Sequence, residues 1–342
     1  MKTTKLNLQL FALQTTLLNN LSPEMKTFYD MTLIDEASAN LVHDQFGQKR
    51  PIPANSGKTI EFRKFAPLAK ATTALTEGVT PNGKDLKVTA VTATVAQYGD
   101  FISQSDVLEL TSLDNTILEA TKLLGRQAGV TLDTITRDVL CAGTNVTYAP
   151  KVAANGTETA VTSRAGLDAS AKLTVKVVQQ VVAKLRSQNA PTINGKYVAI
   201  IHPYVAYDLM RDPEWIDAHK YAQPTNLYTG EIGEIAGVRF VQTTEAKIWN
   251  GAGCPTGLAV FGCLFLGDGA YGITEINGGG LETIVKQKGS AGTADPLDQR
   301  SSIGWKAIKT AKILIPNYLV RVECCSEYSA ETATNMGDAT SN

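Results

Sequence analysis

The alternation of β-branched and polar residues is strongest between residues 56 and 104, where it predicts two strands joined by a long polar tip. Apolar and β-branched residues mark the outgoing strand (Thr59, Ile60, Phe62 and Phe65) and the returning strand (Val88, Thr89, Val91, Thr92, Thr94, Val95, Phe101 and Ile102). About twenty residues separate the strands, whereas ordinary hairpin loops have about two to five. Because an isolated two-stranded ribbon is marginally stable in water, we expect it to lie on its own domain or on a neighbouring molecule.

A helical period follows the ribbon. Apolar residues recur at steps of three, four and seven over residues 113–141 (Leu113, Ile117, Leu124, Ala128, Leu132, Ile135 and Val139), which predicts an amphipathic helix about 42 Å long. Gly125 and Gly129 lie inside this helix, where each costs about 1 kcal/mol relative to alanine. We interpret them as positions of close backbone packing or of a bend. An earlier helix is predicted from Ser22-Pro23 to about residue 45.

The rest of the chain alternates between helical and strand patterns. Residues 145–172 are polar and turn-rich, which predicts a loop or a small excursion. We then expect helices over 174–187, 203–210 and 214–221, and strands over 197–201, 238–243, 258–266 and 281–285. Strands 302–315 and 318–324 are predicted to form a final hairpin that turns at Pro316-Asn317. The low hydrophobicity of 327–342 predicts disorder.

Composition indicates an ordinary globular chain. Its 342 residues allow two domains or one elaborate fold, and the net charge is −1. This balance argues against a free nucleic-acid reader and favours self-association. The five cysteines are odd in number and lack a C-x-x-C pair, so we expect reduced thiols and a cytosolic setting. We expect no secretion signal and no membrane partner, because the apolar start is interrupted by polar residues and no run reaches transmembrane length.

The candidate chemistry is sparse. Gly267, Gly269 and Gly272 have the spacing of a dinucleotide fingerprint, but a non-helical segment follows, so we interpret them as turn glycines. His202, Asp208, Asp212 and His219 could form a metal or acid–base set, although their spacing matches no helix-face ligand pair. Motifs of serine hydrolases, P-loop enzymes and zinc proteases are absent from the sequence. We therefore expect no catalytic residues, no metal and no cofactor.

Clusters of basic residues leave two interpretations open. Lys306, Lys309 and Lys312 indicate a solvated strand face rather than a phosphate-facing patch. The pairs Lys49-Arg50 and Arg63-Lys64 are compatible with surface charge or with salt bridges between subunits.

Four segments, in register along the chain, carry a resemblance to a known family. They are the start LNLQLFA, IIHPYVAYDLMRDPEWIDAH, LYTGEIGEIAGVRFVQTTEA and DPLDQRSSIGWKAIKTAKIL. With the order of predicted elements, they resemble the tailed-bacteriophage major capsid protein of the Hong Kong 97-type fold. The closest resemblance is to the family related to the major coat protein of the podophage N4.

The resemblance implies an α+β fold with a defined domain order. Residues 1–50 would be an N-terminal arm and helix, and 51–104 the extended loop, a β-ribbon. A peripheral domain with a spine helix would cover 105–164, an axial domain 165–285, a return to the peripheral domain 286–326, and a disordered tail 327–342.

The same resemblance implies a self-assembling icosahedral shell in the virion, built of pentamers and hexamers around double-stranded DNA that it contacts non-specifically. A portal protein, and separate scaffolding or decoration proteins, would be partners, and synthesis would occur in the host bacterial cytoplasm. Candidate interface residues lie in the ribbon: Arg63, Lys64, Phe65, Leu68, Lys70, Leu75, Glu77 and Lys84. We predict no crosslink, because no ribbon lysine matches the crosslinking motif of some relatives. The alternatives are an encapsulin-like compartment shell and, less favoured, a soluble α/β enzyme.

Overall fold

The computed structural model describes residues 41–53, 57–65, 88–111, 116–222, 233–275, 280–290 and 295–336, and shorter stretches at 31, 33–34, 36–37, 68, 70–75, 77–78, 80, 83–86 and 342. The chain divides into two compact units. Unit 1 combines residues 1–37, 99–128 and 281–306, and unit 2 combines 38–98, 129–280 and 307–342.

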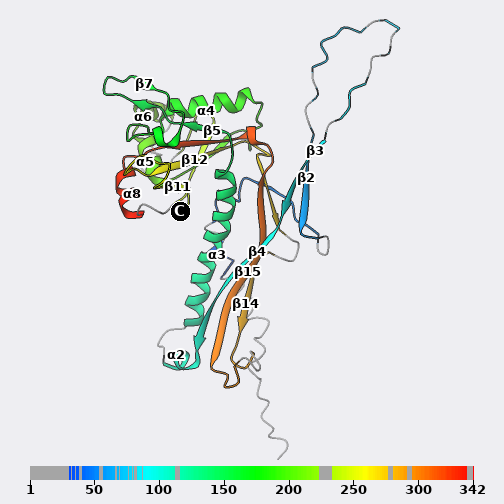
Figure 1. Cartoon of the computed structure of the whole chain (residues 1–342), viewed down its shortest axis with the longest axis vertical. Helices are drawn as coiled ribbons and strands as arrows, with labels where there is room; N and C mark the ends of the chain where they lie inside the picture. Colours follow the sequence, from blue (N-terminus) through cyan, green and yellow to red (C-terminus); the bar gives the residue numbers. More distant parts are fainter. Residues whose placement is uncertain are drawn as a thin grey trace, which may run out of the picture. The chain divides into compact units, whose positions relative to one another are not determined.

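A seven-stranded sheet forms the centre of unit 2 (Figure 1). Its order is β5 (Val146–Tyr148), β16 (Leu319–Cys324), β12 (Val260–Leu266), β8 (Tyr197–Ile201), β10 (Val238–Gln242) and β9 (Glu234–Ile235), with β11 (Ile248–Trp249) also on β12. Strands β8 and β10 are parallel, and β12 is antiparallel to both β8 and β16. The three central strands therefore come from distant parts of the sequence.

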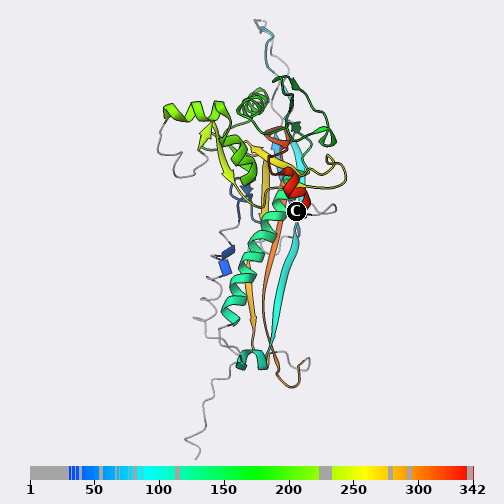
Figure 2. The ribbon, with the colours of Figure 1, turned by 90° about the vertical axis from the view of Figure 1, so that its left-hand side faces the viewer.

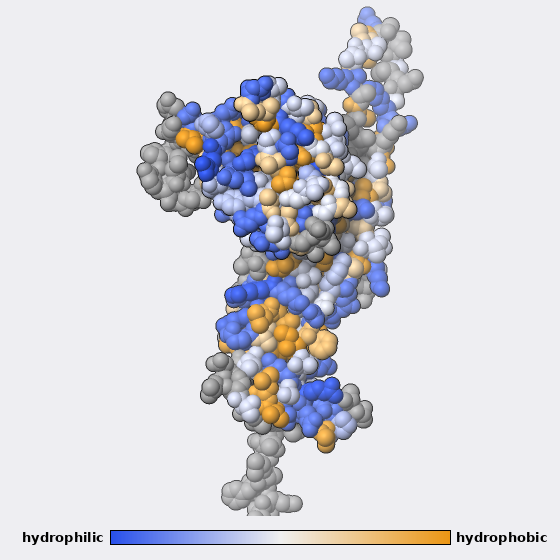
Figure 3. Space-filling model, turned by 60° about the vertical axis from the view of Figure 1, so that its left-hand side comes forward, coloured by the Kyte–Doolittle hydropathy of each residue, from blue (hydrophilic) through white to orange (hydrophobic). Residues whose placement is uncertain are grey.

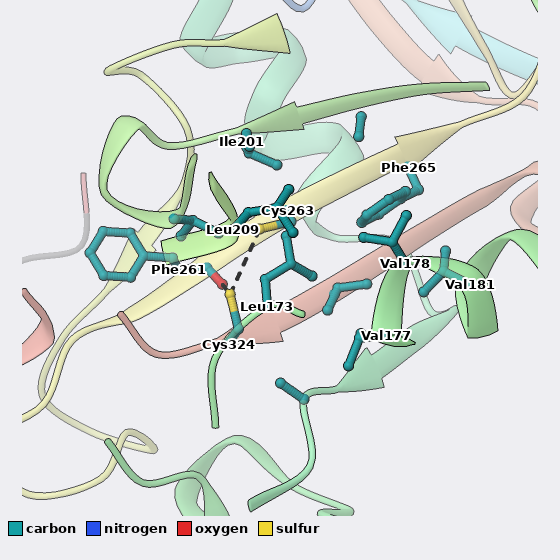
Figure 4. Packing of buried hydrophobic residues seen from close by; sticks show 14 of the residues in the cluster. Leu173, Val177, Val178, Val181, Ile201, Leu209, Phe261, Cys263, Phe265 and Cys324 are labelled. Atoms are coloured by element: carbon teal, nitrogen blue, oxygen red, sulfur yellow. Dashed lines mark hydrogen bonds between the residues drawn. The ribbon is translucent and has the colours of Figure 1, made fainter. Parts of the chain in front are cut away.

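Both faces of this sheet are buried. Alternate residues of the central strands, such as Ile201 and Phe265, pack with helices α4 (Val175–Ser187), α5 (Pro203–Met210) and α6 (Pro213–Ala222) (Figure 4). The intervening residues, such as Ile200 and Leu264, pack with Leu140 of helix α3 (Thr116–Cys141). Burial on both faces explains why these strands read as continuous apolar runs rather than alternating ones.

Side-chain caps fix where the helices of unit 2 begin. The Thr174 hydroxyl accepts a hydrogen bond from the Val177 amide at the start of α4, at 3.4 Å. His202 Nδ1 accepts from the Tyr204 amide at 3.2 Å, and Pro203 occupies the first turn of α5. Such caps satisfy amide groups that the helix itself leaves unpaired.

Unit 2 also contains the ribbon. Strand β2 (Thr59–Phe65) pairs antiparallel with β3 (Val88–Thr94) over seven rungs, from Thr59↔Thr94 to Phe65↔Val88. Near its base, β1 (Gln48–Lys49) is parallel to β13 (Tyr271–Glu275), which pairs with residues 309–313 of β15 (Arg300–Ile313). A further two-stranded hairpin, β6 (Lys151–Val152) and β7 (Glu158–Thr159), lies in the excursion at 145–172.

Unit 1 is built on the first half of β15. Residues 302–306 pair with β14 (Glu282–Lys286), and β15 also pairs with β4 (Ala96–Ser105), so that the three strands lie side by side (Figure 2). The unit further holds α2 (Asp106–Thr111) and the start of α3. A Cβ at Gly125 would lie 2.9 Å from the Leu33 carbonyl oxygen. The predicted close backbone packing at Gly125 is therefore confirmed.

The returning ribbon strand is shorter than predicted. The ribbon ends at Thr94, and Val95 donates a last hydrogen bond to the Lys58 carbonyl at 3.0 Å. Phe101 and Ile102 belong to β4 and pair with β15 instead. Glycines permit this pairing, because a Cβ at Gly99 would lie 2.5 Å from the Trp305 carbonyl oxygen and one at Gly304 would lie 2.8 Å from the Phe101 Cβ.

The predicted final hairpin is wrong. Strands β15 and β16 lie in different sheets, and Pro316–Tyr318 is a turn of 3-10 helix between them. Each strand has a distant partner, β13 for β15 and β12 for β16. These pairings replace the local pairing that the Pro-Asn signal suggested.

The disorder predicted for residues 327–342 is wrong for its first part. Ser329–Met336 form helix α8, and Ala333 is buried in the core of unit 2. The Ser329 hydroxyl accepts from the Ser326 amide at 2.8 Å, and the Ser329 carbonyl accepts from the Ala259 amide at 3.0 Å. Small polar residues thus hold a helix whose composition resembles that of a disordered tail.

Two element boundaries also differ. The helix expected up to residue 45 has already ended at residue 41, and a turn begins at residue 43. The predicted start of this helix at Ser22 lies outside the described residues. The excursion at 145–172 is mostly loop, as predicted, but Val146–Tyr148 joins the central sheet beside β16.

Candidate interaction surface

The tip of the ribbon is exposed along its whole described length. Every described residue from Leu68 to Ala90 is exposed, including Lys70, Glu77 and Lys84. The Leu68 side chain is 61% exposed and Leu75 is 77% exposed. Figure 1 shows this segment beyond the ends of β2 and β3. Such apolar exposure on a long loop is typical of a surface that another molecule covers.

Three predicted interface residues lie on β2. Arg63, Lys64 and Phe65 pair with Ala90, Thr89 and Val88 of β3. Arg63 is exposed, whereas the side chains of Lys64 and Phe65 lie outside the described residues. The structure thus places all eight candidate residues on the ribbon.

The base of the ribbon, in contrast, is anchored. Phe62 is only 3% exposed, and a Cβ at Gly272 would lie 2.8 Å from its ring. Glycine at this position of β13 therefore admits the phenyl ring. Ala93 and Val95 are buried too. The ribbon is fixed to the rest of unit 2 at its base, while the described residues of its tip are exposed.

A pocket of about 330 Å³ opens at this base. It is lined by residues from five separated stretches of unit 2: Gln48 and Arg50, Phe62 and Arg63, Val91, Gly269, and Leu314 and Ile315. The Arg50 guanidinium lies 5.9 Å from the centre of the Phe62 ring. Among the described residues, neither Arg50 nor Arg63 forms an ion pair. The pocket thus combines apolar walls with two available cations.

A buried polar network holds the segment that leads into the ribbon. His43 Nδ1 lies 2.6 Å from Asp133 Oδ2, and the His43 amide donates to Asp133 Oδ1 at 2.7 Å. Asp44 accepts from the Thr136 hydroxyl at 2.6 Å and pairs with Lys309. Because charged groups are buried only when paired, this network fixes residues 43–44 on α3.

The solvated face predicted for the β15 lysines is wrong for Lys309. Its side chain is buried, and its ammonium donates to the Leu132 carbonyl at 2.9 Å as well as to Asp44. Lys306 pairs with Glu282 at 3.3 Å, and Lys312 is exposed. Asp44 lies far from Lys309 in sequence, so the strand pattern alone could not show this partner.

Unit 1 exposes further large apolar side chains. Phe101 is 68% exposed, and Val107, Leu108 and Leu123 are exposed as well. Figure 3 shows that hydrophobic side chains reach the surface among hydrophilic ones on the face drawn there. Unit 1 therefore also offers apolar surface for association.

The candidate metal set serves structural roles. Asp208 pairs with Lys172 at 3.2 Å and accepts from the Glu327 amide at 3.0 Å. Asp212 accepts from the amides of Val175 and Glu214 at the starts of α4 and α6. The His219 side chain lies outside the described residues. Within the described ranges, no three metal-ligating side chains gather, and no helix has the length and apolarity needed to cross a membrane.

The other singled-out residues also pack as structure. All five cysteines are free, and burial raises the pKa of the Cys325 thiol to about 11 and that of Cys141 to about 12. A high pKa keeps a thiol protonated and unreactive. Gly267 and Gly269 lie in the turn before β13, and Gly272 lies within that strand. The interpretation of turn glycines therefore holds for two of the three.

Comparison with known proteins decides the family. A model of the phage capsid protein family matches residues 88–321. The chain belongs to this family. This phage capsid protein is a major capsid protein, and it forms the head shell of the virion by self-assembly. No curated protein is similar to it in sequence.

Solved phage capsids share its mixed α/β fold. The capsid protein of Ralstonia phage GP4 matches with a TM-score of 0.65 at 13% identity, covering 83% of this chain and 88% of that one. The capsid of cyanophage P-SCSP1u gives 0.63 at 14% identity over 82% and 87%. The cyanophage Pam1 capsid gives 0.60 at 14% identity over 85% and 92%.

Sequence reasoning found the ribbon of the capsid protein but missed the pocket at its base. Arg50 and Arg63 were recognised as possible salt-bridge partners between subunits. Val91, Leu314 and Ile315 were expected in strands, but nothing in the sequence indicated that they line one pocket, because only the fold brings their segments together.

Proposed function

We propose that this capsid protein has the Hong Kong 97-type arrangement, in which the ribbon lies across a neighbouring subunit. The observation that supports this role is the contrast between the anchored base at Phe62 and the exposed tip at Leu68 and Leu75. The resemblance to the N4-related family supports the same arrangement, with 105–164 and 286–326 as the peripheral domain and 165–285 as the axial domain.

A neighbouring subunit would cover the strand edges and apolar side chains that the ribbon exposes. Soluble proteins normally avoid long unpaired strand edges, and Leu68 and Leu75 add apolar surface that water does not stabilise. In a closed shell each copy both gives and receives such a contact. Several modest contacts per subunit then act together, which stabilises the shell more than one contact could.

The remaining parts of the proposal concern partners and place. Pentamers and hexamers of the chain would enclose double-stranded DNA without sequence-specific contacts, in keeping with a net charge of −1. A portal protein, and separate scaffolding or decoration proteins, would complete the head, which would be assembled in the host cytoplasm. The chain would have no catalytic activity.

The deciding experiment shortens the ribbon. Replacing residues 67–84 by Asn-Gly removes the exposed tip and keeps the β2–β3 pairing. We expect a folded, soluble subunit that no longer closes into shells, measured by circular dichroism for folding and electron microscopy for closure.

A matched control shortens a different exposed turn. Replacing residues 153–157, all exposed between β6 and β7, by the same Asn-Gly should leave closure unchanged. Normal shells from the ribbon variant would refute the role of the ribbon between subunits. An unfolded product would show that the tip stabilises its own subunit.

A further inference from the structure

We propose that the pocket at the base of the ribbon receives the ribbon tip of a second copy of this chain, with Leu75 against its apolar wall and Glu77 between Arg50 and Arg63. The proposal rests on the ribbon role proposed above and adds which surfaces meet. It assigns the eight residues of the pocket a common partner.

The pocket has the size and lining to receive side chains. About 330 Å³ of space is bounded by Phe62, Val91, Leu314 and Ile315. Val91, Leu314 and Ile315 are half-buried, so their apolar surface still meets solvent in the isolated chain. Gly269 has a φ of +68° and nothing within 4 Å of its Cβ position, which leaves that side of the pocket open.

The charge of the pocket selects an acidic partner. Arg50 and Arg63 are both exposed. Among the residues that the structure describes, no carboxylate lines the pocket and neither guanidinium has an ion-pair partner. Guanidinium groups bind carboxylates through paired, charge-assisted hydrogen bonds. A segment that carries a carboxylate close to an apolar side chain therefore fits both the arginines and the apolar wall of the pocket.

The ribbon tip carries this combination. Leu75 is 77% exposed and Glu77 is exposed two residues later, just before a turn at Gly78, whose φ is +76°. Two residues span at most about 7 Å, so both side chains can enter one pocket. Among the described residues Glu77 forms no ion pair.

A second copy is the natural source of this tip. Tip and pocket are different surfaces of the same chain, so their contact is heterologous and repeats from each subunit to the next. A rotation that brings the last subunit back to the first closes a ring. The pocket would then fix where each ribbon ends on its neighbour.

A charge swap tests the pairing. Glu77→Arg and Arg63→Glu should each lower the yield of closed shells at least tenfold, and the double variant should restore part of the yield, because Arg50 still repels the positive charge introduced at position 77. Circular dichroism confirms that each subunit is folded. Asp85→Arg makes the same charge change at another exposed ribbon position and should leave closure unchanged. A double variant no better than the single ones would overturn the pairing.

A crosslink tests the position without changing charge. Shells are assembled from a mixture of Gln48→Cys and Leu75→Cys proteins and treated with oxidised glutathione, whose disulfide is reduced as the protein disulfide forms. A dimer on a non-reducing gel should appear in the mixture and in neither protein alone. Leu86→Cys, at a ribbon side chain that is also mostly exposed, should give none with Gln48→Cys. Closed shells without a crosslink in the first mixture would overturn the proposal.

Three outcomes separate this proposal from its alternatives. If Arg63→Glu shells close normally but retain less DNA, the pocket binds phosphate and the proposal is wrong. If the protein with the shortened ribbon closes normally, the ribbon role fails and the pocket proposal fails with it. If shells need the ribbon but swap and crosslink both fail, only the pocket is misassigned.

Discussion

The central sheet and the ribbon of unit 2 are both β structure, yet they differ in how much of each strand is buried. All residues of β8 and β12 are buried. In β3, one of the seven residues, Ala93, is buried. The sheet strands read YVAII and VFGCLFL, and the ribbon strand reads VTAVTAT. The first two are apolar at nearly every position, and the third alternates with threonine.

The difference separates what the subunit stabilises alone from what it leaves to a partner. A strand buried on both faces obtains its free energy of folding from its own chain. The described residues of the ribbon tip are exposed, so in the proposed arrangement they become buried only when a neighbouring subunit binds. Mutations in the two regions should therefore affect different measurements, folding in the sheet and closure in the ribbon.

The largest expected effect on folding comes from the sheet core. Phe265 is fully buried and packs against Phe240, with ring centres 6.4 Å apart. Phe265→Ala should lower the free energy of unfolding by about 3–5 kcal/mol, because it removes buried apolar surface and leaves a cavity. Urea denaturation of the subunit measures this change.

The ribbon supplies the counterpart. Leu75→Ala, at a side chain that is mostly exposed, should change the free energy of unfolding by less than about 0.5 kcal/mol while lowering the yield of closed shells. Equal losses of unfolding free energy in Phe265→Ala and Leu75→Ala would contradict the view that the sheet, and not the ribbon tip, stabilises the isolated subunit.

A second contrast compares two glutamates. Glu323 on β16 is fully buried, accepts two hydrogen bonds from the Arg164 guanidinium at 2.7 Å each, and lies 2.9 Å from Arg321 Nε. Arg164 also stacks on the Trp249 ring at 3.9 Å. Glu323→Gln should cost about 3 kcal/mol of unfolding free energy, because two half-buried cations lose their fully buried counter-charge.

Glu77 is the matched residue on the ribbon. Glu77→Gln should leave urea denaturation unchanged, since an exposed carboxylate contributes little to folding. A Glu323→Gln protein as stable as the unchanged one would show that water or another group compensates the two arginines.

The sequence predicted the continuous apolar elements of the sheet region well. Strand β8 and helix α5 have the predicted bounds, because a five-residue apolar run and a helix opened by His202-Pro203 are local signals. The pairing of β15 and β16 was wrong because strand partners are chosen over long sequence distances. Helix α8 was missed because its buried residues, such as Ser329 and Ala333, are small and mostly polar.

The interaction surface divides in the same way. The ribbon could be predicted, since its β-branched strands and polar tip are contiguous in sequence. Its base could not, because Phe62 depends on a gap that Gly272 leaves in a strand far along the chain. Residues that act through neighbours in space leave no periodic pattern to read.

The smallest effect expected from the sheet region is a pH dependence that the ribbon should not share. Burial lowers the pKa of His202 from 6.5 to about 4. The neutral His202 ring accepts a hydrogen bond from the Tyr204 amide at the start of α5. Between these two values the unfolded chain binds a proton that the folded subunit does not. Stability is therefore greatest above pH 6.5 and falls as the pH decreases toward 4.

The change between pH 7 and pH 5 should be about 1–2 kcal/mol of unfolding free energy, measured by urea denaturation at both values. His202→Asn keeps an oxygen that can accept the same amide hydrogen but cannot titrate, so its pH dependence should be smaller by that amount. Because the ribbon tip stays exposed in the folded subunit, shortening residues 67–84 should leave the pH dependence of unfolding as it was. If the His202→Asn protein instead keeps the full pH dependence of unfolding, His202 does not cause it, and a different titrating group is responsible.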